Sequence, residues 1–384
     1  MSAIALALAA VGPGASVVAS SAPTPKLRLL GLARVGNTGT NDFDSPVALA
    51  FDGTNVWVAN EGDWSGGNGS ITEFDPGTGT LVRTLSSGLY GFSTPESVAI
   101  AGREVWVANS SGGAEGSGSV TELDAGTGAL VRTLSGAHYD FNTPEGVAAA
   151  GAHIWVANIG AAGGGAGSVT ELDASTGALV RTLSGGPYGF NGPFALAVAG
   201  TDIWVANSGA ADGGFGSVTE LDASTGAWVR TLSGRPYGFN DPRALASDGT
   251  HIWVANSGEM TGGIGSVTEL DASTGAWVRT LSGSRYGFNT PNGVAAAGTH
   301  IWVTNGGAAR GGDGSVTELD ASTGAWMRTL SGNSYRVNFP RGVVAAGARV
   351  YVANSFLPNK EGPVGGPGSV TEYDASNGAL MKSL

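Results

Sequence analysis

One aromatic residue returns at a constant interval along almost the whole chain. The anchor residues lie 49 residues apart and are Trp57, Trp106, Trp155, Trp204, Trp253, Trp302 and Tyr351. A period of about 20–50 residues is typical of solenoids and propellers, in which each unit buries its apolar face against its neighbours. Seven copies of one unit therefore predict a single closed array, although 384 residues would otherwise suggest two or three domains.

Each unit contains four short apolar runs separated by turn-forming residues. In the third unit the runs cover residues 144–150, 154–158, 168–172 and 178–183. Their short length, their Val, Thr and aromatic content and their Gly, Asn and Asp boundaries are typical of strands. No segment shows a sustained helical period, so we expect an all-β chain with almost no helix.

The sizes of the residues predict the order of the four strands of a unit from the axis to the rim. The first run is rich in Gly, Val and Ala, which fit where sheets converge on an axis, and the second carries the Trp, which fits a wider wedge. Between the third and fourth runs, Asp173 and Gly177 are suited to cap and close a hairpin turn. The sequence therefore predicts a seven-bladed β-propeller with four antiparallel strands per blade.

The two ends of the chain differ from the repeat. Residues 1–25 have an apolar run followed by small residues, which resembles a secretory leader cleaved near residue 19 but lacks a positive start. The alternative is a disordered Ala/Ser-rich tail. We predict a propeller domain over residues 26–384 in a secreted or cell-surface (extracellular or periplasmic) protein. Residues 27–35 resemble a further strand, which we expect at the seventh blade, beside or in place of residues 379–384.

Composition limits the partners. The net charge of −12 makes nucleic acid and anionic membranes poor partners, and the absence of cysteine excludes thiolate metal sites and cysteine nucleophiles. The acids of the glycine-rich loops between second and third strands lack the spacing of a calcium loop. The apolar run near the start is too short to span a bilayer. We expect a monomer with no metal, no cofactor and no membrane span.

The repeated motifs Pro-x-Gly-Val-Ala, Val-Trp-Val-Ala-Asn and Ser-Val-Thr-Glu-Leu-Asp resemble NHL and YVTN-type repeats. They are also similar to the streptogramin-lyase-like (virginiamycin B lyase-like) group. The resemblance covers residues 27–384 and implies a seven-bladed propeller, a frame that carries enzymes, ligand binders and assembly platforms.

The lyases of that group use histidines and a glutamate at the channel mouth. This sequence has only His138, in a loop between blades, and His153, His251 and His300, which precede second strands on the opposite face. No histidine pair converges, so the resemblance does not carry the lyase chemistry over. We interpret the histidines as exposed turn residues.

The residue after the proline of each first strand varies, although the sequence around it is nearly constant. From the first to the seventh unit it is Val47, Glu96, Glu145, Phe194, Arg243, Asn292 and Arg341. The propeller geometry places these residues around one mouth of the channel. Neutral drift is one explanation. The other is a ligand-binding mouth with an acidic and a basic arc, suited to a zwitterionic or polar ligand and formed by Glu96, Glu145, Phe194, Arg243, Asn292 and Arg341.

Two further patterns recur on the outer strands. Glu171 and Arg181 represent an acid–base pair present in every unit, which we interpret as an exposed rim pair. The fourth strands of units four to six begin with Trp228, Trp277 and Trp326, where other units have leucine. These indoles either pack between neighbouring outer strands or form an aromatic patch for a polysaccharide or protein.

The sequence favours a binding or interaction platform whose partner is a polar small molecule, a glycan or a protein. One alternative is a propeller lyase or hydrolase with Glu96 and Glu145 as acid/base groups and Arg243 or Arg341 steadying an anion. A raised pKa on either glutamate would favour that enzyme. A second alternative is a structural repeat protein without a small ligand.

Overall fold

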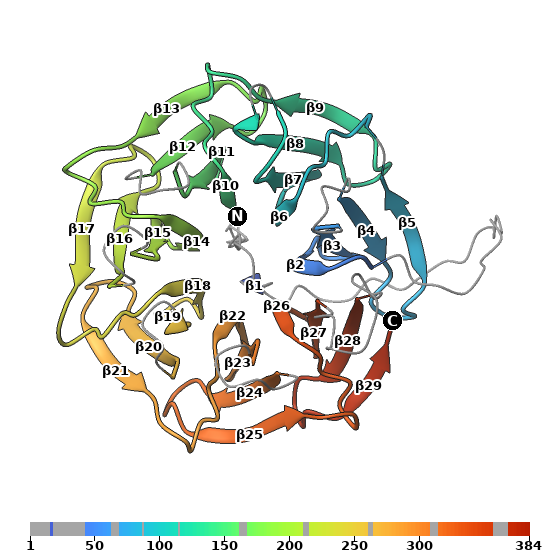
Figure 1. Cartoon of the computed structure of the whole chain (residues 1–384), viewed down its shortest axis with the longest axis vertical. Helices are drawn as coiled ribbons and strands as arrows, with labels where there is room; N and C mark the ends of the chain where they lie inside the picture. Colours follow the sequence, from blue (N-terminus) through green and yellow to red (C-terminus); the bar gives the residue numbers. More distant parts are fainter. Residues whose placement is uncertain are drawn as a thin grey trace, which may run out of the picture.

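The computed structural model is a ring of seven antiparallel sheets around a central channel (Figure 1). The structure describes residues 16–17, 43–62, 69–86, 88–113, 116–160, 167–209, 215–259, 264–307, 314–355 and 368–384. Each sheet is one blade, and its strands follow the chain from the axis to the rim.

The innermost strands begin with a proline and are β2 (Pro46–Phe51), β6 (Pro95–Ala101), β10 (Pro144–Ala150), β14 (Pro193–Ala199), β18 (Pro242–Ser247), β22 (Pro291–Ala297) and β26 (Pro340–Ala346). The second strands carry the anchor aromatic residue and are β3 (Val56–Asn60), β7 (Glu104–Asn109), β11 (His153–Asn158), β15 (Asp202–Asn207), β19 (His251–Asn256), β23 (His300–Asn305) and β27 (Arg349–Asn354).

The third strands begin with a serine and are β4 (Ser70–Phe74), β8 (Ser119–Asp124), β12 (Ser168–Asp173), β16 (Ser217–Asp222), β20 (Ser266–Asp271), β24 (Ser315–Asp320) and β28 (Ser369–Asp374). The outer strands are β5 (Leu81–Leu85), β9 (Leu130–Leu134), β13 (Leu179–Leu183), β17 (Trp228–Ser233), β21 (Trp277–Leu281), β25 (Trp326–Ser331) and β29 (Leu380–Ser383). The described residues contain no α-helix, and the prediction of a seven-bladed propeller is confirmed.

Blades one and seven close the ring. The inner strands β2 and β26 lie side by side, and Tyr351 donates a hydrogen bond from its hydroxyl to the Pro76 carbonyl at 2.7 Å. Strand β29 is the outer strand of blade seven, as expected of the C-terminal run. The strand predicted over residues 27–35 lies outside the described residues. A short strand, β1 (Ser16–Val17), pairs in parallel with β26 on the channel side.

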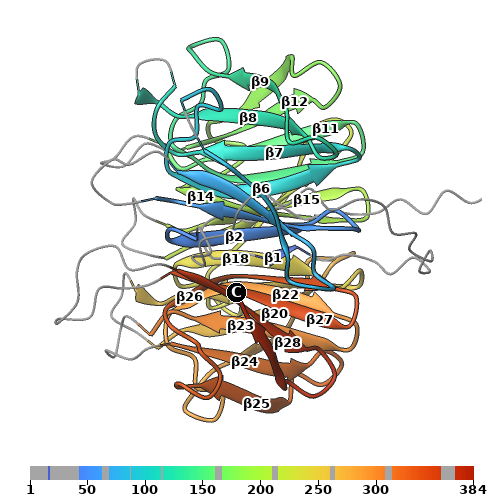
Figure 2. The same cartoon turned by 90° about the vertical axis from the view of Figure 1, so that its right-hand side faces the viewer.

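Figure 2 shows the blades side on. The buried apolar residues form clusters that each include residues of several blades, so the core lies between blades. The anchor Trp residues of blades one to six and Tyr351 are fully buried. At the end of each second strand an asparagine is buried. In blade three, Asn158 donates from Nδ2 to Ser168 Oγ at 3.2 Å and Thr170 Oγ1 at 3.1 Å. These asparagines therefore fix the third strand against the second.

The hairpin turns have the predicted chemistry. Asp173 Oδ1 accepts hydrogen bonds from the backbone amides of Ser175 at 3.0 Å and Thr176 at 2.8 Å. Bonds from both hydroxyls and these amides lower the pKa of Asp173 to about 2. Gly177 has φ of 70°, a left-handed conformation that glycine adopts without a steric cost.

The recurring glutamate of the third strand is buried, so its interpretation as half of an exposed rim pair was wrong. Glu171 has no exposed side-chain surface, and its Oε2 lies 2.8 Å from Arg181 Nε. The arginine also reaches the next blade. Arg132, paired with Glu122, donates to the carbonyls of Ser175 and Thr176. The pair is thus part of the contact between blades.

In each blade, the residue that opens or directly precedes the second strand faces the buried third-strand glutamate of that blade. In blades three and six, His153 Nδ1 lies 3.0 Å from Glu171 and His300 Nδ1 lies 2.8 Å from Glu318. The interpretation of these histidines as simple exposed turn residues is therefore corrected. Blade four has Asp202 in this position, and the like charge contributes to raising the pKa of Glu220.

Candidate functional site

The seven variable residues that follow the inner-strand prolines occupy an irregular position in the sheet. In blade three, Pro144 pairs with Asn158 and Gly146 with Ala157, which leaves Glu145 without a pairing partner. The register shifts at the same place in every blade. A β-bulge of this kind redirects a side chain and is common next to functional sites. All seven residues therefore lie at the same end of the channel.

The residue before each of these prolines has a left-handed backbone. Thr143 has φ of 55° and Asp241 has φ of 52°, whereas blade four has Gly192 there. Positive φ is costly for residues other than glycine and is often found near functional sites. The chain thus maintains a strained backbone around this mouth in six blades.

Arg243 is held by two neighbours. Its Nε lies 2.8 Å from Asp241 Oδ1, and its guanidinium carbon lies 4.6 Å from the centroid of the Phe194 ring in the adjacent blade. Asp241 is fully buried, and its other oxygen accepts a hydrogen bond from Ser257 Oγ at 2.6 Å. The arginine is therefore oriented before any ligand binds.

Arg341 connects blade seven to blade one. Its Nη1 lies 3.5 Å from Glu61 Oε2, and both side chains are mostly buried. Glu61 directly follows β3, and it was not among the predicted site residues.

Two glutamates on adjacent blades complete the cluster. Glu96 is buried, and its Oε1 accepts a 3.4 Å hydrogen bond from Ser110 Oγ. Burial raises the pKa of Glu96 well above its ordinary value, and the charges of Glu145 and Glu61 raise it further. Burial raises the pKa of Glu145 to about 7, although Arg243 and Arg341 oppose the shift. The structure therefore brings Glu96, Glu145, Arg243 and Arg341 into one electrostatic cluster.

The other members of the ring have different surroundings. Phe194 and Val47 are both buried. The Phe194 ring contacts the Arg243 guanidinium, and Val47 belongs to the core. Asn292 is half-buried, and a Cβ at residue 306 would lie 2.5 Å from its Nδ2. No contact in the described residues joins Asn292 to the charged cluster.

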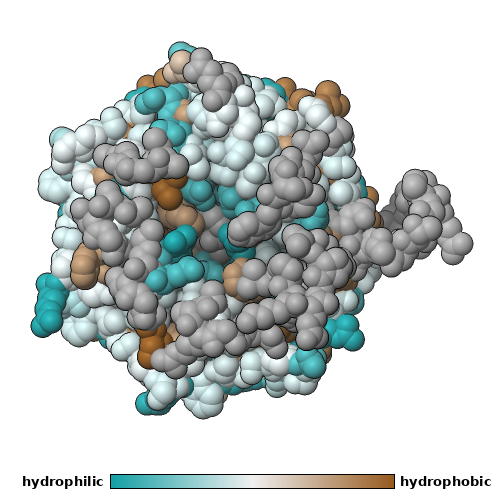
Figure 3. Space-filling view, viewed as in Figure 1, coloured by the Kyte–Doolittle hydropathy of each residue, from teal (hydrophilic) through white to brown (hydrophobic). Residues whose placement is uncertain are grey.

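Sequence reasoning missed Glu61 and Asp241. Both stand at positions that differ between units: Glu61 aligns with Ser110 and Ser257, and Asp241 aligns with Thr143. The sequence signal for Asp241 is therefore variation between units at the residue before the proline. The signal for Glu61 is variation at the residue after the buried asparagine. Figure 3 shows hydrophilic residues gathered around the central hollow of this face.

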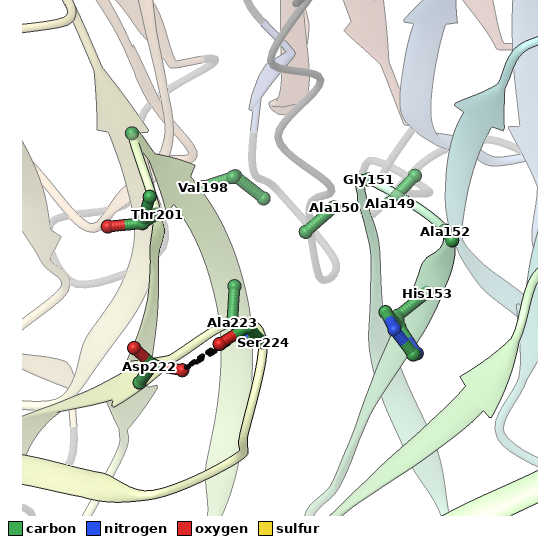
Figure 4. Close-up of a pocket in the computed structure, with 11 residues that line it drawn as sticks. Ala149, Ala150, Gly151, Ala152, His153, Val198, Thr201, Asp222, Ala223 and Ser224 are labelled. Atoms are coloured by element: carbon green, nitrogen blue, oxygen red, sulfur yellow. Dashed lines mark hydrogen bonds between the residues drawn. The ribbon is translucent and has the colours of Figure 1, made fainter.

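A second recess lies on the opposite face, between blades three and four (Figure 4). This cavity of about 450 Å³ is lined mostly by Ala, Val and Gly residues. Its polar groups already have partners, because Ser224 Oγ donates to Asp222 Oδ1 at 2.7 Å and His153 faces Glu171. The recess has fewer charged groups than the mouth.

The indoles of blades four to six are exposed at the rim. Their exposed fractions are 47% for Trp228, 43% for Trp277 and 40% for Trp326. More than half of each indole is covered, so these values are compatible both with packing against neighbouring strands and with an exposed aromatic face. The rings of the interblade loops stack in pairs, such as Tyr139 and Phe141 with 5.4 Å between ring centroids, and they cover the core, since Phe141 is buried.

Within the described residues, no group of three or more histidine and carboxylate side chains could hold a metal ion. The same part of the chain has no helix long and apolar enough to cross a membrane.

Comparison with known proteins gives the fold and no family. No protein-family model matches the sequence, and no curated protein matches it either. Among solved structures, the chain is similar to hydrazine synthase of Kuenenia stuttgartiensis with a TM-score of 0.65 and 18% identity. The match covers 90% of this chain and 100% of that chain. At this identity the likeness supports the propeller fold alone.

Proposed function

We propose that the protein binds a polar ligand carrying a positive group at the channel mouth formed by Glu96, Glu145, Phe194, Arg243, Asn292 and Arg341. The propeller frame supports a binding or interaction platform. The observation that carries the proposal is the electrostatic cluster. Two glutamates with raised pKa values lie opposite two arginines, and all four side chains are on sheet bulges.

The raised pKa values of the two glutamates indicate which chemical group of a ligand would bind to them. Burial raises the pKa of Glu96 well above its ordinary value and that of Glu145 to about 7, so both favour the protonated form more than an exposed glutamate does. An ammonium group placed between them would favour their ionised forms and displace those protons. The arginines, which Asp241 and Glu61 hold in place, would face the anionic end of a zwitterion. Amino acids, short peptides and amines are therefore the first ligands to test.

Ligand binding is expected to strengthen as pH rises from 6 to 8. Glu145 must lose its proton to pair with an ammonium group, and its pKa is about 7. The test is a thermal-shift screen of amino acids, short peptides and amines, followed by calorimetry of each hit at several pH values. Loss of one charge-assisted contact in a Glu145→Gln variant should weaken binding about ten-fold.

His138→Asn is the matched control, because His138 is an exposed residue of the loop that leads to the same mouth. It should bind as the wild type does. A hit whose affinity is the same in wild type and Glu145→Gln would place the ligand elsewhere.

An enzyme is the second candidate, and the pKa of about 7 on Glu145 favours it. A general acid or base works best when its pKa is near the working pH. In that case, Glu145→Gln would retain substrate binding within a few-fold but lose turnover. A binding protein would lose affinity and show no turnover in either form.

We further propose that the protein is secreted or displayed at the cell surface and is related to the NHL and YVTN-type, streptogramin-lyase-like propellers. The leader-like residues 1–25 and the repeated motifs support this. Amino-terminal sequencing of protein from the culture medium tests the location. A chain retained in the cytoplasm with residue 1 intact would contradict it.

A further inference from the structure

The outer wall of blades four to six differs from the rest of the rim. Strands β17, β21 and β25 are consecutive outer strands of the ring (Figure 1), and each begins with a tryptophan. The corresponding residues of the other blades are Leu81, Leu130, Leu179 and Leu380. The fold therefore accepts leucine at this position, and the indoles are not needed to form the blade.

Each indole has a fixed orientation. Nε1 donates to the threonine three residues later, at 3.0 Å for Trp228 to Thr231, 3.0 Å for Trp277 to Thr280 and 2.9 Å for Trp326 to Thr329. The polar edge of each ring is thus satisfied within the protein, while close to half of its surface is in contact with solvent. A side chain that is already oriented loses little conformational freedom when a partner binds.

The three indoles make no ring contacts with one another within the described residues. They form separate aromatic faces, one at the start of each of these outer strands. A compact protein partner favours one continuous apolar patch. Separate aromatic faces at a regular interval instead suit a polymer that presents an apolar ring face repeatedly.

We propose that Trp228, Trp277 and Trp326 bind a neutral polysaccharide along the outer wall of blades four to six. The C–H face of a sugar ring stacks on an indole, and the hydroxyl edges remain in water. The net charge of −12 disfavours anionic polysaccharides, and each nearby rim arginine is paired with a buried glutamate. This surface is separate from the channel mouth.

The test is depletion of the full-length protein from solution by suspensions of microcrystalline cellulose, chitin and insoluble neutral β-glucan, with polygalacturonate as the anionic probe. The wild type should bind at least one neutral polysaccharide and not polygalacturonate. The triple variant Trp228→Leu/Trp277→Leu/Trp326→Leu should bind at least about ten-fold less tightly. Because leucine stands there in other blades, its circular dichroism and melting temperature should remain close to those of wild type.

Glu145→Gln is the control, because the mouth plays no part in this contact, and it should bind the polysaccharide as the wild type does. Absence of binding to all three neutral polysaccharides would overturn the proposal, as would equal binding by the triple variant. A change from dimer to monomer in the triple variant, measured by light scattering, would identify the tryptophans as a contact between copies and would also overturn it.

Discussion

Replacing Trp155 by alanine is expected to lower the free energy of unfolding by about 3–5 kcal/mol, the usual range for truncating a buried aromatic residue. Trp155 is fully buried on β11, in the core between blades. Urea denaturation followed by circular dichroism measures the effect.

Two phenylalanine variants separate packing from hydrogen bonding. The indole Nε1 of Trp155 has no hydrogen-bond partner, whereas that of Trp253 donates to Asp248 Oδ2 at 3.0 Å. Trp155→Phe should therefore cost less than Trp253→Phe, which leaves a buried carboxylate oxygen short of one donor. Thr225→Ala, at an exposed turn residue, is the control. If Trp155→Ala and Thr225→Ala lowered the free energy of unfolding equally, the role of Trp155 in packing between blades would be contradicted.

Replacing Asp202 by histidine is expected to stabilise the protein at pH 8 by about 1–2 kcal/mol, since one pKa unit corresponds to about 1.4 kcal/mol. Glu220 is almost fully buried and its pKa is raised to about 7, chiefly by burial and also by the charge of Asp202. Histidine already stands in this position in blades three, five and six. The change therefore removes a like charge and supplies a donor.

The sign of the pH dependence follows from the raised pKa. The folded state holds the Glu220 proton up to about pH 7, whereas the unfolded state loses it near the ordinary glutamate value. This contribution to stability is present at low pH and is lost as the pH rises through 7. Asp202→His should therefore flatten the decline in stability between pH 5 and pH 8, as measured by urea denaturation.

His153→Asp is the reverse control, because it places the acidic partner of blade four into blade three. It should lower stability at pH 8 and steepen the decline in stability between pH 5 and pH 8. If Asp202→His lowered stability at pH 8, or if neither variant changed the pH profile, the pairing of these positions with the buried glutamates would be wrong.

The fold could be predicted because the period repeats the same local signals seven times. The proline of each first strand, the Trp of the second and the Asp-to-Gly turn of the hairpin each specify one feature of a blade. The position of Glu145 at the mouth followed from the same repeat, since the residue after the proline of each first strand lies at the same end of every blade.

The remaining features depend on contacts between distant residues. Glu61 and Arg341 are far apart in the sequence and meet only because blade seven closes on blade one. The burial of Glu171 was missed because charged pairs on outer hairpins are usually solvated. Its partner His153 was missed because a residue at a turn gives no sign of the strand it faces. The recess near Ala149 depends on side-chain packing, which no local pattern encodes.

The burial of Glu96 also matters for stability. Exposed charges contribute little, so replacing an exposed mouth charge by alanine would leave stability nearly unchanged. Glu96 is buried, and Glu145 and Arg243 are half-buried, with Arg243 tied to the buried Asp241. Isosteric variants such as Glu145→Gln are therefore the appropriate probes of function, because alanine would leave partners without their contacts.

The central claim is that the mouth residues form one partly buried electrostatic cluster. Carbon-13 NMR titration of the glutamate carboxyls, with Glu145 assigned by its absence in Glu145→Gln, measures this directly. The structure predicts a midpoint near pH 7 for Glu145 and a higher midpoint in Arg243→Gln, because Arg243 opposes the rise. A midpoint near that of an exposed glutamate, unchanged by loss of Arg243, would contradict the cluster and the ligand site built on it.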